Sequence, residues 1–210
     1  MAVHDRTMTG RKAGPWKLAP ASLKTCPAAA TPDNRRLPGM IPPMSHQEHK
    51  RASPTNIRCY VLTVSDTRTE ETDTGGRLLR ELLTENGHEV IGHAIVPDEA
   101  KTLRYAISAQ LDTDVVQAVI TTGGTGISRR DGTYEVVSDL LDKRLDGFGE
   151  LFRTLSFEEI GPSAMLSRAC AGAARGKVLI SMPGSQNAVR MGMTRLVLPE
   201  LGHLVREVTR

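Results

Sequence analysis

The sequence predicts an α/β fold, a three-layer α/β/α sandwich built on a mostly parallel sheet. Short apolar runs of strand length alternate along the chain with segments whose aliphatic residues recur at helical spacing. Small, polar and acidic residues follow most of the strand-length runs. Parallel strands need crossover connections, and the intervening helices supply them while covering both faces of the sheet.

The order of the elements is visible from residue 57 onward. Strands are expected over residues 57–64, 88–96, 115–122 and 177–182. Helices are expected around leucines 78–83 with a stop at Asn86-Gly87, and over 103–111, 134–141, 148–159, 164–169 and 201–208. Pro199 should kink or divide the last of these helices, because proline lacks the backbone N–H that an internal helical position needs.

Residues 1–56 differ from the rest of the chain. They are rich in proline, alanine, serine and threonine without sustained periodicity, so we expect a disordered basic tail, with Met44 as the more natural start. They hold nine of the 27 Lys and Arg residues and three of the 24 Asp and Glu residues, a net charge of +6. The main domain, residues 57–210, is therefore slightly acidic. The scattered basic residues favour a solvated tail over a segment that binds nucleic acid or membrane.

Composition excludes several other classes of protein. The chain is 39% hydrophobic and 24% charged, which suits a globular domain, and no apolar run approaches the length of a membrane span. The N-terminus lacks the continuous apolar stretch of a secretory signal. Three distant cysteines without a CxxC pair argue against a zinc site or a disulfide framework. We therefore expect a cytoplasmic protein, with Cys59 as a buried small hydrophobe.

A glycine-rich turn follows the third expected strand, at residues 121–126 (TTGGTG). Glycines after a strand let the backbone turn tightly, and the exposed N–H groups of such a turn can hold phosphate oxygens. No Lys-Ser or Lys-Thr pair follows, so it is not a Walker loop, and it is not a dinucleotide fingerprint either. The alternatives are a phosphate-binding loop and a plain connection from a strand to a helix.

Three aspartates lie where strands end or just beyond: Asp66, Asp98 and Asp131. Because the carboxyl ends of parallel strands share one edge of the sheet, we expect the three to converge. Mg²⁺ favours few carboxylates together with substrate phosphates, which makes this edge a candidate metal-nucleotide site. Each aspartate also has a structural interpretation: Asp66 and Asp98 as turn residues, and Asp131 as a helix cap in competition with Thr133.

Ser167 and Arg168 form a second candidate phosphate contact. A hydroxyl donor beside a guanidinium group can hold a phosphate by hydrogen bonding and charge. The alternative is a polar turn that leads into the next element. No GxSxG occurs, and the histidines lack metal-ligand spacing, so a serine hydrolase and a histidine metal centre are poorly supported.

Seven segments occur together in a recognisable order: TVSDT, DTGG, VPD, TTGGTGISRRDGTYE, GFGELFR, LSRACAG and MPGS. Over residues 57–210 they resemble the MoaB/MogA family of molybdenum cofactor biosynthesis, and LFRTLSFEEIG is more similar to the MoaB branch. The resemblance implies a homo-oligomer, a trimer or, in the MoaB branch, a hexamer. It also implies binding of molybdopterin, whose phosphate active members adenylylate with Mg²⁺ and ATP.

By motif, the resemblance assigns Asp98 and Asp131 as the catalytic and metal-binding acids. It implies that Gly123, Gly124, Thr125 and Gly126 form the phosphate-binding loop, that Ser167 contacts molybdopterin, and that Ser65 and Asp66 lie in the same cleft. Arg168 remains a candidate phosphate contact from its position beside Ser167. The chain has Tyr134 where some MogA-like members have proline. Alternatives are a non-catalytic molybdopterin carrier, a competence-damage-type enzyme acting on a phosphorylated metabolite, and a nucleic-acid module that rests only on the tail. The interpretation adopted involves neither nucleic acid nor membrane.

Overall fold

The computed structural model describes residues 53–210, and the expected tail before residue 53, Met44 included, lies outside them. One six-stranded sheet has the order β2-β1-β3-β6-β5-β4. The strands are β1 (Arg58–Val64), β2 (Glu89–Val96), β3 (Ala118–Thr122), β4 (Lys143–Arg144), β5 (Cys170–Ala174) and β6 (Lys177–Met182). The helices are α2 (Thr74–Glu85), α3 (Ala100–Leu111), α4 (Thr133–Leu140), α5 (Asp146–Ile160), α6 (Gln186–Gly192) and α7 (Leu198–Val208).

Four neighbouring strands are parallel. β1 pairs with β2 on one side and with β3 on the other, and β3 pairs with β6, all in parallel register. β5 is antiparallel to β6, and the two-residue β4 is antiparallel to β5 at the sheet edge. The mostly parallel sheet expected from the sequence is confirmed, with an antiparallel edge of two strands added.

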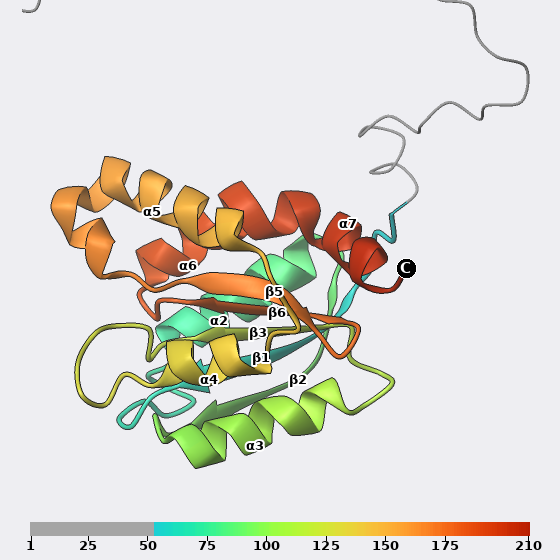
Figure 1. The fold of residues 1–210 in the computed structure, drawn as a ribbon, viewed down its shortest axis with the longest axis horizontal. Helices are drawn as coiled ribbons and strands as arrows, with labels where there is room; N and C mark the ends of the chain where they lie inside the picture. Colours follow the sequence, from blue (N-terminus) through green and yellow to red (C-terminus); the bar gives the residue numbers. More distant parts are fainter. Residues whose placement is uncertain (1–52) are drawn as a thin grey trace, which may run out of the picture. The chain divides into compact units, whose positions relative to one another are not determined.

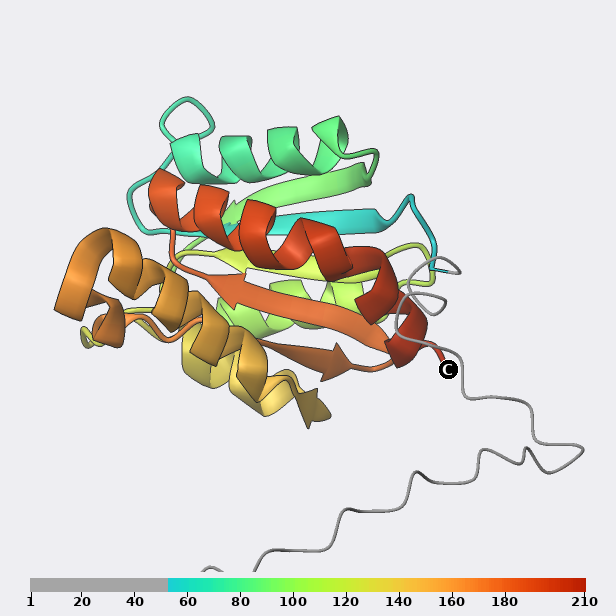
Figure 2. The ribbon, with the colours of Figure 1, turned by 90° about the horizontal axis from the view of Figure 1, so that it is seen from above.

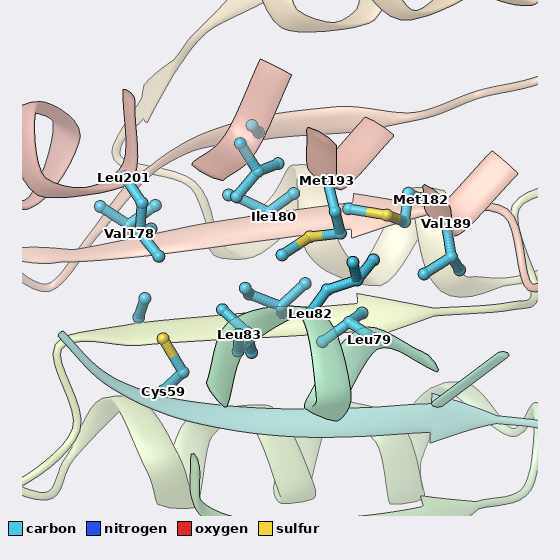
Figure 3. Packing of buried hydrophobic residues seen from close by; sticks show 14 of the residues in the cluster. Cys59, Leu79, Leu82, Leu83, Val178, Ile180, Met182, Val189, Met193 and Leu201 are labelled. Carbon is cyan, nitrogen blue, oxygen red and sulfur yellow. The ribbon is translucent and has the colours of Figure 1, made fainter. Parts of the chain in front are cut away.

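Helices cover both faces of the sheet, which gives three layers (Figure 1). α3 and α4 lie on one face, whereas α2, α5, α6 and α7 lie side by side on the other (Figures 1 and 2). Each face has its own apolar cluster. Beneath α2 and α6–α7, Leu79, Leu83, Ile180 and Met193 pack against one another with no more than trace exposure (Figure 3). Cys59 belongs to this cluster and is fully buried, as expected.

The start and end of α2 follow from local chemistry. The carboxylate of Asp73, its N-cap residue, accepts a hydrogen bond from the Gly76 N–H at 2.9 Å and another from the Thr63 hydroxyl at 2.6 Å. At the other end, Asn86 is the C-cap, and Gly87 follows with a positive φ of 80°. Asn86-Gly87 therefore ends the helix as the sequence predicts.

The expected helix over residues 164–169 is wrong. A 3-10 helix, η1, occupies Gly161–Leu166, and the chain then becomes extended toward β5. Neither β4 nor β5 was predicted, because CAGAA lacks the β-branched residues typical of strands. β5 forms through its hairpin with β6, whose turn places Arg175 and Gly176 at positive φ.

The C-terminal helical segment begins earlier than expected and carries the predicted division near Pro199. It starts at Gln186 and passes through a π-helical turn, η2 (Met193–Val197), before α7. Pro199 lies in the first turn of α7, where it has no N–H to donate to the carbonyl four residues before it. The widened turn directly before proline is a common way to accommodate this loss.

The described chain begins in contact with the main domain. Asn56 donates from its side-chain amide to the Gly87 carbonyl at 2.7 Å, so residues just before β1 contact the turn between α2 and β2.

Among residues 53–210, no helix is both long enough and apolar enough to cross a bilayer.

Candidate functional site

The glycine loop after β3 brings backbone unusually close to its surroundings. Gly123 and Gly124 have φ values of +104° and +62°, which side chains other than glycine rarely tolerate. A Cβ on Gly123 would lie 2.2 Å from the Val64 carbonyl oxygen at the end of β1. A Cβ on Gly124 would lie 2.2 Å from Thr133 Oγ1 and 2.5 Å from Asp98 Oδ2. The two glycines thus allow the loop to pass directly between the ends of β1 and β2 and the start of α4.

The three aspartates at the strand ends converge as the topology predicts. Asp66 Oδ1 accepts a hydrogen bond from the Asp98 N–H at 3.1 Å, which joins the ends of β1 and β2. Asp98 Oδ1 accepts one from the Gly132 N–H at 3.1 Å, which joins β2 to the start of α4. Asp66 also forms an ion pair with Arg130, whose Nη2 lies 2.7 Å from Asp66 Oδ2.

The pKa values of the two neighbouring aspartates shift in opposite directions. Burial raises the pKa of Asp98, and the negative charges of Asp131 and Asp66 raise it further, although the Gly132 N–H opposes this. The hydrogen bond from Arg130 lowers the pKa of Asp66. Burial and the two neighbouring carboxylates thus oppose ionisation of Asp98, whereas the Arg130 ion pair favours ionisation of Asp66.

Asp131 organises the loop instead of capping α4. Its Oδ2 accepts a hydrogen bond from the Ser128 N–H at 2.8 Å, and Gly132 is the N-cap residue, with no side-chain cap bond. Thr133, the other candidate cap, is fully buried, and its hydroxyl has no hydrogen-bond partner within the described part of the chain. Both capping expectations are therefore wrong.

Arg168 braces the glycine loop against α4. Its guanidinium group donates to the carbonyl oxygens of Thr125 and Asp131 at 3.3 and 3.1 Å, and forms an ion pair with Glu135. It also stacks over the Tyr134 ring, 5.0 Å from the ring centroid. Sequence reasoning places Arg168 in the cleft as a phosphate contact, whereas its donors are engaged by the protein in this structure.

The two serine candidates differ in their surroundings. Ser65 Oγ accepts hydrogen bonds from the N–H groups of Thr67 and Arg68 at 3.3 and 3.1 Å, so it shapes the loop after β1. Ser167 Oγ is buried and has no partner among the described residues. A buried hydroxyl without a partner costs free energy unless water or a ligand satisfies it. Ser167, next to Arg168, is therefore the candidate whose hydroxyl group still lacks a hydrogen-bond partner among residues 53–210.

The carboxylates fit a magnesium site that substrate completes. Within residues 53–210 no three His, Cys, Asp or Glu side chains form a group that could hold a metal ion by themselves. Asp98 and Asp131 each use one oxygen for a backbone N–H and keep the other without a protein hydrogen bond in this part of the chain. Mg²⁺ is commonly held by one or two carboxylates together with substrate phosphates. The free carboxylate oxygens of Asp98 and Asp131 match this type of ligand set.

Three contacts of the candidate site were not predicted from the sequence: Arg130 pairs with Asp66, Glu135 pairs with Arg168, and the Tyr134 ring lies under the Arg168 guanidinium group. The only signal was that all three residues belong to the RRDGTYE motif. Pairing across separate elements is set by the tertiary fold, and no local pattern could have assigned these partners.

The fold agrees with comparisons to known proteins. A family described as "Probable molybdopterin binding domain" matches residues 60–203. Molybdenum cofactor biosynthesis protein B of Bacillus cereus is 54% identical over 168 residues, which are 80% of this chain and 99% of that protein. A crystal structure of molybdenum cofactor biosynthesis protein B has a TM-score of 0.72 and 54% identity, covering 74% of this chain and 98% of its own.

A more distant solved structure agrees with this assignment. The tungsten cofactor synthesizing protein MoaB from Pyrococcus furiosus has a TM-score of 0.65 and 38% identity, and the match covers 75% of this chain and 100% of that one. The order of motifs, the fold and these matches point the same way. The chain therefore belongs to the molybdopterin-binding domain family of molybdenum cofactor biosynthesis, on the side of its MoaB members.

Proposed function

We propose that this domain binds molybdopterin and adenylylates its terminal phosphate with Mg-ATP. The observation that carries the proposal is the position of Asp98 and Asp131 directly beside the glycine loop, at the carboxyl ends of the parallel strands. Ligands of open α/β sheets bind at this edge. A carboxylate pair beside backbone N–H groups suits a Mg-nucleotide, because the metal and the N–H groups can share the phosphate charge.

The proposed reaction depends more on positioning the two phosphate groups than on proton transfer. An oxygen of the molybdopterin phosphate attacks the α-phosphorus of ATP, and the bond from that phosphorus to the leaving pyrophosphate breaks. The nucleophile is already an anion, so no strong general base is needed, which agrees with a site that contains no His or Cys candidate. Mg²⁺ held by Asp98 and Asp131 would neutralise charge that accumulates on the phosphates. The loop N–H groups would orient the same oxygens.

The remaining candidate residues have supporting roles in this proposal. The unpartnered Ser167 hydroxyl supports a direct hydrogen bond to molybdopterin. Arg168 acts as a positioning residue, because its donors already hold the loop carbonyls of Thr125 and Asp131. Asp66 holds the Asp98 backbone and Arg130, so it fixes the geometry of the acidic pair.

We also propose that the chain works as a homo-oligomer, with a hexamer favoured over a trimer. The exposed apolar side chains on α5 and η1 support self-association, because a monomer rarely leaves so many large apolar groups in water on one hairpin. These side chains are 49–72% exposed and comprise Leu151, Phe157, Ile160, Met165 and Leu166.

The test is formation of adenylylated molybdopterin by the purified protein with ATP and Mg²⁺. We expect product from the wild type, a loss of at least about 100-fold in Asp131→Asn, and wild-type turnover in Asp114→Asn. Asp114 is an exposed aspartate in the connection before β3, outside the site, and provides the matched control.

Each other result has a definite meaning. Full turnover in Asp131→Asn would remove Asp131 from the site. Tight molybdopterin binding without any product would replace the transferase with a molybdopterin carrier. If the protein neither binds molybdopterin nor forms adenylylated product, the proposed function is wrong.

A further inference from the structure

An aromatic side chain from the first turn of α4 supports the Arg168 brace. The Arg168 guanidinium group lies over the Tyr134 ring, with its Cζ 5.0 Å from the ring centroid. Tyr134 is half-buried, and the Arg168 side chain is 23% exposed, so the stacked pair is partly shielded from water. A guanidinium group that stacks on an aromatic ring is restrained in its plane, and this plane sets the directions of its N–H groups.

The plane of the Arg168 guanidinium group matters because its N–H groups serve three different segments. Nε donates to the Thr125 carbonyl at 3.3 Å, Nη2 donates to the Asp131 carbonyl at 3.1 Å, and Nη1 pairs with the Glu135 carboxylate. An arginine side chain has several rotatable bonds and much rotamer entropy to lose. A restrained plane therefore favours the conformation in which Arg168 reaches all three acceptors at once.

A second arginine fixes the position of the ring. Arg144 of β4 donates from Nη2 to the Tyr134 hydroxyl at 2.9 Å, and its Cζ lies 5.7 Å from the ring centroid. Arg144 also donates to Asp146 Oδ1 and to Ser138 Oγ, each at 3.2 Å. The antiparallel edge of the sheet thus holds the Tyr134 ring at its hydroxyl group, while the ring supports Arg168.

We propose that Tyr134 is a positioning residue of the adenylyl-transfer site, because it holds the Arg168 guanidinium group in the plane from which that group fixes residues 125–131. The inference rests on the proposed function, since the loop held in this way carries the Asp131 carboxylate of the magnesium site. Tyr134 acts through Arg168 and contacts neither the substrates nor the metal. The short strand β4 then contributes to the site by supplying Arg144.

The first test measures the loop in the ligand-free protein and does not depend on turnover. The Asp131 N–H donates to the Ser128 carbonyl at 3.1 Å, and the Ser128 N–H donates to Asp131 Oδ2 at 2.8 Å. Hydrogen exchange of these two amides therefore reports opening of the loop. We expect Tyr134→Leu to speed their exchange about tenfold, because a partly desolvated cation–π contact is lost.

Two further variants calibrate this measurement. Tyr134→Phe keeps the ring face and loses only the bond to Arg144, so exchange should be about threefold faster than in the wild type. The matched control is Tyr105→Leu, the same exchange at a side chain of α3 that is 79% exposed, and it should leave both amides unchanged.

The second test separates positioning from a general loss of stability. With molybdopterin, ATP and Mg²⁺, kcat should fall about tenfold in Tyr134→Leu and about threefold in Tyr134→Phe. A merely structural role would lower Tm and leave kcat per folded molecule unchanged. In an Arg168→Met background, Tyr134→Leu should have little further effect on kcat, because the group that Tyr134 positions is absent.

The inference is wrong if exchange in Tyr134→Leu equals that of the wild type, or if exchange is faster while kcat is unchanged. Effects of Tyr134→Leu and Arg168→Met that multiply in the double variant would also overturn it, since independent roles behave in that way. If the wild type forms no adenylylated molybdopterin, the proposed function is wrong, and the exchange rates alone decide whether Tyr134 holds the loop.

Discussion

Replacing Gly124 by alanine tests whether the glycine loop determines the position of the Asp98 carboxylate. The new Cβ would lie 2.2 Å from Thr133 Oγ1 and 2.5 Å from Asp98 Oδ2, well inside van der Waals contact. Thr133 is fully buried at the start of α4 and has little room to move. The Asp98 side chain should therefore be displaced, together with the half of the acidic pair that it provides.

The loss of folding stability in Gly124→Ala has two contributions, and a matched control variant separates them. An alanine in the left-handed region costs about 1 kcal/mol relative to glycine. Relief of the two clashes adds about 1–3 kcal/mol, the usual cost of overpacking. Gly176 has a similar φ of +72° but no atom within 4 Å of its hypothetical Cβ, so Gly176→Ala should show the first part alone. For a domain of this size, 1 kcal/mol lowers Tm by about 2–4 °C.

The assay is thermal unfolding of both variants beside Mg-ADP binding and AMP transfer. We expect Tm to fall by about 4–16 °C in Gly124→Ala and by about 2–4 °C in Gly176→Ala. AMP transfer should drop about 100-fold in Gly124→Ala alone, because a misplacement of 1 Å at a reacting centre has that effect. If both variants unfold at one temperature, and Gly124→Ala keeps full turnover, the loop does not position Asp98.

Two further predictions concern pH and charge. Burial and the Asp131 and Asp66 charges raise the Asp98 pKa in the folded state, so the ionised carboxylate destabilises the ligand-free protein. Asp98→Asn should therefore raise the free energy of unfolding in urea at pH 7 by about 0.5 kcal/mol while turnover is lost. A clear loss of stability in this variant would contradict the prediction. Burial lowers the pKa of His88 below its ordinary 6.5, and its Nδ1 accepts from the Ile57 N–H at 3.3 Å. The unfolded chain therefore takes up this proton first as pH falls below 6.5, so the free energy of unfolding should decrease from there toward the folded pKa. His88→Asn should flatten this slope in unfolding curves between pH 5 and 8, and an unchanged slope would exclude His88 as its source.

The fold was predictable from the sequence where local pattern and burial agree. The buried parallel strands consist of continuous apolar runs, and α2 begins and ends at residues with clear capping chemistry. β5 and β4 were missed because pairing partners, and not intrinsic propensity, make CAGAA and KR extended. Residues 164–166 adopt the tighter η1 turn because the chain must become extended by Cys170 to pair with β6.

The candidate site was predictable to the extent that topology determines it. Asp66, Asp98 and Asp131 meet because the ends of β1, β2 and β3 share one edge of the sheet. No local sequence pattern could predict which partner each of these neighbouring side chains binds. Asp131 and Arg168 bind the loop backbone, and Arg130 pairs with Asp66, because the fold brings residues from distant segments together.

The brace formed by Arg168 has a consequence for the thermodynamics of binding. Its bonds to Thr125 and Asp131 hold the glycine loop in one conformation before any ligand arrives. A preorganised loop loses little conformational entropy on binding, so more of the contact free energy appears as affinity. Binding of a phosphate ligand, as in the proposed function, should then be close to rigid-body docking, with little rearrangement of the loop backbone.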